Sequence, residues 1–171
     1  AYMPNWEEAD ALPSGYSAKS VSVGDNFVCS LIDDGDVYCW GRNNGGQVGM
    51  GDVCTSLQQP DACDHYRTCG SPCYYQGVGT PQQVDLGSGV KATAIHSSHL
   101  YTCAIIEDGS VQCWGDNSDG QMGSTSSTAI SSPVNVSFST SVSMISTGGE
   151  HLCALLVNGN VKCLGSNQYG Q

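Results

Sequence analysis

Residues 103–123 read Cys-Ala-Ile-Ile-Glu-Asp-Gly-Ser-Val-Gln-Cys-Trp-Gly-Asp-Asn-Ser-Asp-Gly-Gln-Met-Gly. The pattern within it, Cys-x9-Cys-Trp-Gly-x-Asn-x-x-Gly-Gln, also occurs at 29–47 and at 153–171, where Leu164 replaces the tryptophan. A long spaced pattern that occurs three times in one chain indicates a repeat protein. The repeat says much about architecture and little about chemistry.

Each copy of the repeat predicts a β-hairpin. An apolar run, a turn and a second apolar run separate the two cysteines, and the turns at 33–35, 107–109 and 157–159 all end in glycine. Pairing Cys29 with Cys39 leaves a three-residue loop, in which the third residue takes a positive φ that costs glycine least. Spacing and turn chemistry therefore agree in every copy.

One face of each hairpin, here called the cysteine face, is apolar because side chains alternate along a strand. Its members are Cys29, Leu31, Val37 and Cys39; Cys103, Ile105, Val111 and Cys113; and Cys153, Leu155, Val161 and Cys163. The opposite face is mixed, with Ile32, Tyr38 and Trp40 in the first copy and Ala154, Leu156 and Lys162 in the third. Sheets with apolar residues on both sides need neighbours on both sides, as in stacked blades.

The cysteine usage predicts disulfides and an oxidising compartment, since the chain has an even number of cysteines, ten, and six of them occur in the regular positions of the repeat. Residues directly opposite each other in a hairpin are within disulfide range, which predicts the bridges Cys29–Cys39, Cys103–Cys113 and Cys153–Cys163. Zinc is the weaker alternative, because two thiolates per hairpin make half a site. With no bilayer-spanning run and no signal peptide before Ala1, we expect a mature secreted chain or an extracellular fragment of a longer one.

The repeat resembles that of the regulator of chromosome condensation family, whose repeats end in a Trp-Gly-x-Asn-x-x-Gly-Gln-Leu-Gly-like signature. Residues 41–49 and 115–123 match it, with Val48 and Met122 where leucine is usual. A Gly-x-x-His segment, a second family signature, precedes an apolar strand at 148–151. The resemblance covers roughly residues 20–171 and implies an all-β fold of four-stranded β-propeller blades. The paired cysteines look like those of secreted relatives.

The resemblance implies little about function, because one fold hosts many functions. Nuclear members bind chromatin and a small GTPase. This chain has a net charge of −11 with only five Lys and Arg, which argues against nucleic acid and anionic membranes as partners. A secreted bacterial β-lactamase inhibitor shares the fold and works through loops on one propeller face. None of its inhibitory residues can be carried over to this chain.

The chain divides into an N-terminal arm, 1–20, and three repeats, 21–89, 90–141 and 142–171. The arm is either a docking segment or a poorly ordered terminus. Segments 80–84 and 132–136 each open a further strand, with Pro81 and Pro133 expected near its first position. The third repeat lacks such a strand.

The first repeat carries a cysteine-rich insertion at 50–79. Its cysteines, Cys54, Cys63, Cys69 and Cys73, allow three pairings, and their irregular spacing favours two disulfides over a four-thiolate zinc site. The insertion is also the candidate binding loop, because aromatic residues and arginine are enriched at binding hot spots. The residues concerned are His65, Tyr66, Arg67, Tyr74 and Tyr75. A purely structural loop is the alternative.

We expect no catalytic site, metal or cofactor. His96 and His99 need further ligands from elsewhere to hold a metal. Residues 116–120 look like a calcium loop but lack the downstream glutamate and belong to the repeat signature. No nucleophile elbow surrounds any serine. Asn135 heads the only N-glycosylation sequon.

Three blades are fewer than the four to eight of closed propellers, so something must cover the end faces. Either the chain is part of a longer propeller, or copies associate head to tail, or it is a self-sufficient monomer. The candidate assembly residues are Trp6, Tyr16, Leu164 and Tyr169. We therefore expect an extracellular structural or protein-interaction module that self-assembles into a filament or ring. The alternative is a secreted inhibitor or glycan-binding module that acts through propeller loops.

Overall fold

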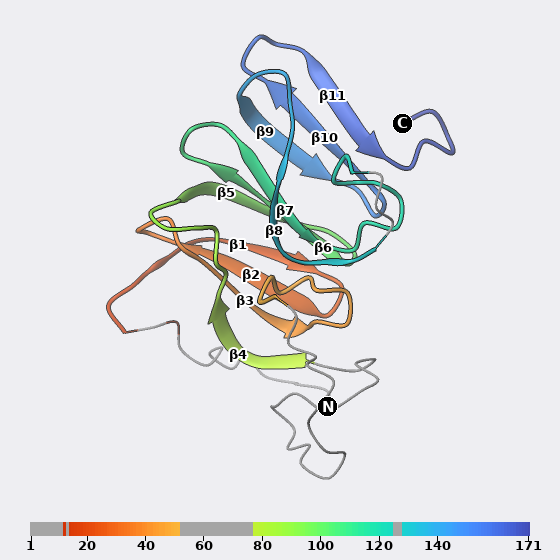
Figure 1. The fold of residues 1–171 in the computed structure, drawn as a ribbon. Coiled ribbons are helices and arrows are strands. Elements are labelled where there is room, and N and C mark those ends of the chain that lie inside the picture. The colour runs from red at the N-terminus through yellow and green to blue at the C-terminus, as the bar shows by residue number, and fades with distance from the viewer. Residues whose placement is uncertain (1–11, 13, 52–76, 125–127) are drawn as a thin grey trace.

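The structure, a computed structural model, describes residues 12, 14–51, 77–124 and 128–171, and this part of the chain is all-β. It forms three antiparallel sheets that follow one another along the chain (Figure 1). The first contains β1 (Ala18–Gly24), β2 (Phe27–Ile32), β3 (Val37–Arg42) and β4 (Gly77–Gln83). The second contains β5 (Ala92–Ser97), β6 (Tyr101–Ile106), β7 (Val111–Gly115) and β8 (Ile130–Val136). The third contains β9 (Val142–Thr147), β10 (His151–Leu156) and β11 (Val161–Gly165). The predicted fold of propeller-like blades is confirmed.

The hairpins form with the predicted register and turn. Cys29 lies opposite Cys39, Ile32 N–H donates to Asp36 O at 3.0 Å, and Gly35 N–H donates to Ile32 O at 3.1 Å. Gly35 has φ 91°, where a side chain would strain the backbone. The same pair of bonds closes the hairpins that end in Gly109 and Gly159. The three-residue loop is therefore a property of the repeat.

The signature after each hairpin folds a tight loop through its two amides. The Asn43 side-chain oxygen accepts from Val48 N–H at 3.0 Å, and the Gln47 side-chain oxygen accepts from Gly45 N–H at 2.8 Å. In the second sheet Asn117 Oδ1 accepts from Met122 N–H at 2.9 Å in the same way. The calcium-like segment 116–120 is thus occupied by loop-forming hydrogen bonds.

The outer strands differ from the prediction in one respect. Pro81 is the fifth residue of β4 and Pro133 the fourth of β8, so neither stands near the first position. Both β4 and β8 are edge strands, and their pairing shifts register between Cys39 and Gly41 and between Cys113 and Gly115. Edges and irregularities are where a sheet tolerates a residue without N–H, and this explains the misplacement. Residues 77–79 of the expected insertion belong to β4.

Two apolar cores lie between successive sheets. The first joins the cysteine face of the first sheet to the second sheet, and it includes Leu31, Val37, Ile95, Ile106 and Trp114. The second joins the cysteine face of the second sheet to the third, and it includes Ile105, Val111, Ile145, Leu152 and Leu156. The cysteine faces of the first two sheets therefore each pack on the sheet that follows in the chain.

Candidate interaction site at the open ends of the blade stack

Both junctions between sheets use the same main-chain hydrogen bond. At the first junction Ala92 N–H donates to Gly35 O at 2.8 Å, and at the second Val142 N–H donates to Gly109 O at 2.8 Å. In each case the glycine at a hairpin tip binds the start of the next inner strand. This hydrogen bond fixes the position of each sheet relative to the sheet before it.

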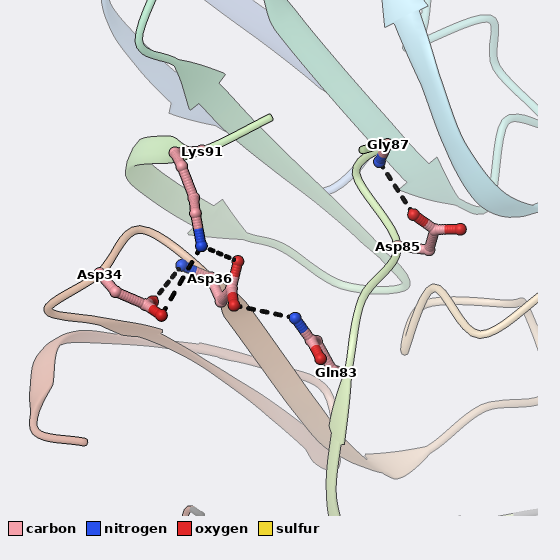
Figure 2. A network of polar contacts seen from close by, with 6 residues as sticks. All are labelled: Asp34, Asp36, Gln83, Asp85, Gly87 and Lys91. Carbon is pink, nitrogen blue, oxygen red and sulfur yellow. Dashed lines mark hydrogen bonds and ion pairs between the residues drawn. The ribbon is translucent and has the colours of Figure 1, made fainter. Parts of the chain in front are cut away.

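A charged network reinforces the first junction (Figure 2). Lys91 Nζ lies 2.7 Å from Asp36 Oδ1 and 3.6 Å from Asp34 Oδ2, and the hydrogen bond to Asp36 raises the pKa of Lys91. Gln83 donates to the second oxygen of Asp36 at 2.9 Å. At the second junction Ser141 occupies the place of Lys91 and donates to Asp108 O at 3.3 Å. The network therefore links the hairpin tip of the first sheet to the residue that precedes β5 in the second.

Buried side chains add a second set of contacts across the junctions. Trp114 is fully buried and donates from Nε1 to Gln47 O, in the signature loop after β3, at 2.9 Å. The hydroxyl of Tyr101 reaches the third sheet, where it lies 2.5 Å from His151 O and 3.1 Å from Gly148 O and can donate to either. Burial raises the pKa of Tyr101, so this hydroxyl remains a donor. The junctions therefore contain hydrogen bonds between buried side chains and main-chain oxygens as well as apolar contacts.

The third sheet leaves its cysteine face open. The structure contains the expected bridges Cys29–Cys39, Cys103–Cys113 and Cys153–Cys163. The cysteines of the first two are fully buried, whereas Cys163 is exposed. Val161 is 64% exposed, although the equivalent Val37 and Val111 are both 0% exposed. Among the described residues no sheet packs on this face. The apolar surface that a following blade covers in the first two sheets is therefore in contact with solvent in the third.

The opposite end of the stack is open along β1. Val21 is 65% exposed, whereas the equivalent Ile95 and Ile145 are 7% and 1% exposed. Trp40, equivalent to the buried Trp114, is half-buried. Ile32, farther out on the same face, is already buried. The inner part of this face is therefore available for contact.

The predicted assembly residues are distributed unevenly. Tyr16 is 44% exposed beside the first sheet and Tyr169 is 93% exposed after the third. Leu164 does not lie on the open face: it packs on the core between the second and third sheets, with Gly123 beside it. Alternation explains the difference, because Leu164 follows Cys163 and points to the other side of β11. Trp6 lies outside the described residues.

Other predicted residues fall outside the described part of the chain or stand alone. The candidate binding loop and the insertion's cysteines are outside it; they are His65, Tyr66, Arg67, Tyr74, Tyr75, Cys54, Cys63, Cys69 and Cys73. Asn135 is exposed on the edge strand β8. The exposed face of Leu155 and Val161 was not among the candidates. The signal was present in the sequence, since Leu155 and Val161 belong to the cysteine face of the third repeat.

The described residues do not assemble a metal-binding group of three or more His, Cys, Asp or Glu side chains. Hollows of about 210 Å³ and 280 Å³ lie at equivalent places in the first two sheets, against Asp36 and Gln83 in one and Ser110 and Asn135 in the other. Recurrence at equivalent positions marks them as features of the repeat. The part of the chain that the structure describes contains no helix that is long and apolar enough to cross a membrane.

Comparison with known proteins identifies the repeat. Two family models described as "Regulator of chromosome condensation (RCC1) repeat" match, one at residues 18–47 and 142–171 and the other at 34–105 and 108–155. Human E3 ubiquitin-protein ligase HERC2 is 31% identical over 120 residues, which cover 70% of this chain and 2% of that protein. Arabidopsis thaliana ultraviolet-B receptor UVR8 is 27% identical over 109 residues, 64% of this chain and 20% of the receptor.

Solved structures show the same fold at low identity. Yeast RCC1 (Prp20), solved with Kap60, has a TM-score of 0.66 at 18% identity, over 88% of this chain and 32% of that one. Human WBSCR16 has a TM-score of 0.67 at 22% identity, over 93% of this chain and 37% of that one. The CRINKLY ectodomain of the Arabidopsis thaliana receptor kinase ACR4 has a TM-score of 0.53 at 20% identity, over 91% of this chain and 43% of that one. The chain thus spans less than half of each.

Proposed function

The chain belongs to the regulator of chromosome condensation repeat family, and from this premise we propose that it is a non-catalytic, extracellular interaction module that associates with copies of itself. The observation that carries the proposal is the exposure of Val161, when both of its equivalents are fully buried under a following sheet. Apolar area of this kind is stabilised by about 25 cal/mol for each Å² removed from water. At the two junctions within the chain, the following blade covers the equivalent face. A further blade is therefore the surface that fits the exposed face of the third sheet.

A protein partner accords with what related structures contain. Yeast RCC1 (Prp20), which has this fold, was solved with the protein Kap60 bound. The negative charge of this chain, −11, favours a protein partner over nucleic acid, whose phosphates require clustered cations. The same charge makes copies repel one another, so we expect added salt to strengthen self-association.

An extracellular location is supported by the cysteines. Three disulfides occur among the described residues, and such bridges persist in oxidising compartments. The ACR4 structure provides an example of this fold in an ectodomain. Asn135 is exposed on β8, the edge strand of the second sheet, and belongs to neither the first nor the third sheet, so a glycan on it is compatible with self-association through those sheets.

The test is sedimentation velocity of the full, disulfide-intact chain over a wide range of protein concentration. We expect the mean mass to rise with concentration and the Val161→Lys variant to remain monomeric. Val157→Glu is the matched control, because Val157 is 62% exposed but lies in the hairpin turn, where the other repeats carry Asp33 and Glu107. A wild-type chain that stays monomeric at every concentration would overturn the proposal.

A further inference from the structure

The inference concerns how two copies meet, and it rests on the proposed self-association. We infer that the third sheet of one copy seats the first sheet of the next in the register of the junctions inside the chain. Such a contact is heterologous, because it joins two different surfaces. Repetition of it produces a ring if the rotation closes and a filament if it does not.

The residue before β1 accepts the same main-chain hydrogen bond as the residues before β5 and β9. Within their own sheets, Ser17 O accepts from Asp33 N–H at 2.9 Å, Lys91 O from Glu107 N–H at 3.0 Å, and Ser141 O from Val157 N–H at 3.0 Å. Ser17, Lys91 and Ser141 are therefore equivalent. The next residues, Ala92 and Val142, donate to the hairpin glycine of the preceding sheet. The equivalent bond between copies runs from Ala18 N–H to Gly159 O.

The space around the hairpin glycines shows where the next copy fits. A Cβ added to Gly35 would lie 2.8 Å from Lys91 Cβ, and one added to Gly109 would lie 2.5 Å from Ser141 Cβ. At Gly159 no atom of the described structure would lie within 4 Å. The following blade occupies this space at the first two tips. At the third tip the equivalent occupant is Ser17 of the next copy.

The tryptophan contact extends the register to the other end of the strands. Trp114 Nε1 donates to Gln47 O, in the signature loop of the preceding repeat, at 2.9 Å. Gln171 is the equivalent of Gln47, since each side-chain oxygen accepts from the N–H two residues before it, at 2.9 Å and 2.8 Å. Trp40 is the equivalent of Trp114 and is half-buried. In the head-to-tail contact Trp40 Nε1 therefore donates to the main-chain oxygen of Gln171.

A second copy is the occupant that these observations favour, because one chain carries both halves of the junction. Its last sheet presents Leu155 and Val161, and its first sheet presents Val21. Ile32 and Tyr38 are already buried, which restricts the contact to the inner strand and Trp40. Two hydrogen bonds between copies, one accepted by Gly159 O and one by Gln171 O, then align the apolar surfaces. A blade of some other protein would need the same hydrogen bonds.

Two variants that each block one surface test the direction of the contact. Val21→Lys leaves the last sheet intact, and Val161→Lys leaves the first sheet intact. We expect each to be monomeric alone and an equimolar mixture to form a two-chain complex and nothing larger, as measured by light scattering on a sizing column. If the surfaces instead pair with themselves, one variant still dimerises alone and the mixture forms no new complex, which overturns the inference while self-association stands.

Two finer variants test the register in the full chain. Gly159→Ala places a methyl group where Ser17 of the next copy must approach, and we expect association to weaken at least tenfold. Gly89→Ala is the control for backbone strain, since both glycines have positive φ and open surroundings. Trp40→Phe removes one hydrogen bond and should weaken association about tenfold. Unchanged association in both Gly159→Ala and Trp40→Phe would overturn the register. A monomeric wild type would overturn the proposed function as well.

Discussion

The indole Nε1 of Trp114 donates to the main-chain oxygen of Gln47 at 2.9 Å, across a junction between two sheets and a sequence separation of 67 residues. Both residues belong to the repeat signature, but the bond joins different copies of it. Thr102 Oγ1 contacts the same oxygen at 3.4 Å. The signature therefore serves two purposes: it shapes its own loop through side-chain amides, and it offers a backbone acceptor to the next blade.

Trp114→Phe should lower the free energy of unfolding by about 1–3 kcal/mol, because it leaves Gln47 O with the weaker of its two donors in a buried site. Urea denaturation followed by circular dichroism measures the change. Trp40→Phe is the matched control in dilute, monomeric protein, since Trp40 is half-buried and has no neighbouring copy there. An equal loss in both variants would contradict the role of the junction.

Gly109→Ala should destabilise the chain more than Gly159→Ala. Both residues have positive φ, 81° and 85°, so the backbone strain is similar. Only at Gly109 does the new methyl group meet another blade, through Ser141. We expect the free energies of unfolding to differ by about 1–3 kcal/mol, the usual range for overpacking, in thermal or urea denaturation of monomeric protein. Equal losses would show that the hairpin tip tolerates the added methyl group.

Mild reduction of the native chain should open Cys153–Cys163 before Cys29–Cys39 or Cys103–Cys113. Access governs thiol–disulfide exchange, and of the three bridges among the described residues Cys153–Cys163 is the one that lies on an open face. Timed treatment with a small thiol, followed by alkylation and peptide mass spectrometry, gives the order. The monomeric Val161→Lys variant should react faster than assembled wild type, because assembly covers the bridge. Earlier labelling of Cys29 or Cys39 would contradict this order.

Acidification should reveal a contribution from His96. Burial lowers the pKa of the half-buried His96 below its ordinary value. The unfolded chain then binds a proton at higher pH than the folded chain, so the free energy of unfolding decreases as the pH falls below about 6.5. His96→Gln should reduce this decrease, as measured by urea denaturation between neutral and mildly acidic pH. His99→Gln, at an exposed position, is the control that should retain it.

Much of the local structure could be predicted because its causes are local. The third position of each loop requires a positive φ, which the glycines at 35, 109 and 159 adopt without strain, and the three-residue loop sets the register that places each cysteine opposite its partner. The outer strands were less predictable. Pro81 and Pro133 sit inside β4 and β8, because an irregular edge accepts a missing N–H that a regular strand interior would not.

The sequence by itself determined the hairpins, their bridges and the existence of two faces, since strand alternation and turn chemistry act over a few residues. Only the tertiary structure decided which neighbour covers each face. The cysteine face of one sheet packs on the next sheet, which buries Val37 and Val111, leaves Val161 in solvent and turns Leu164 inward. Alternation defines two sides of a strand, but the direction in which blades stack depends on contacts such as Trp114 with Gln47, which join residues far apart in the chain.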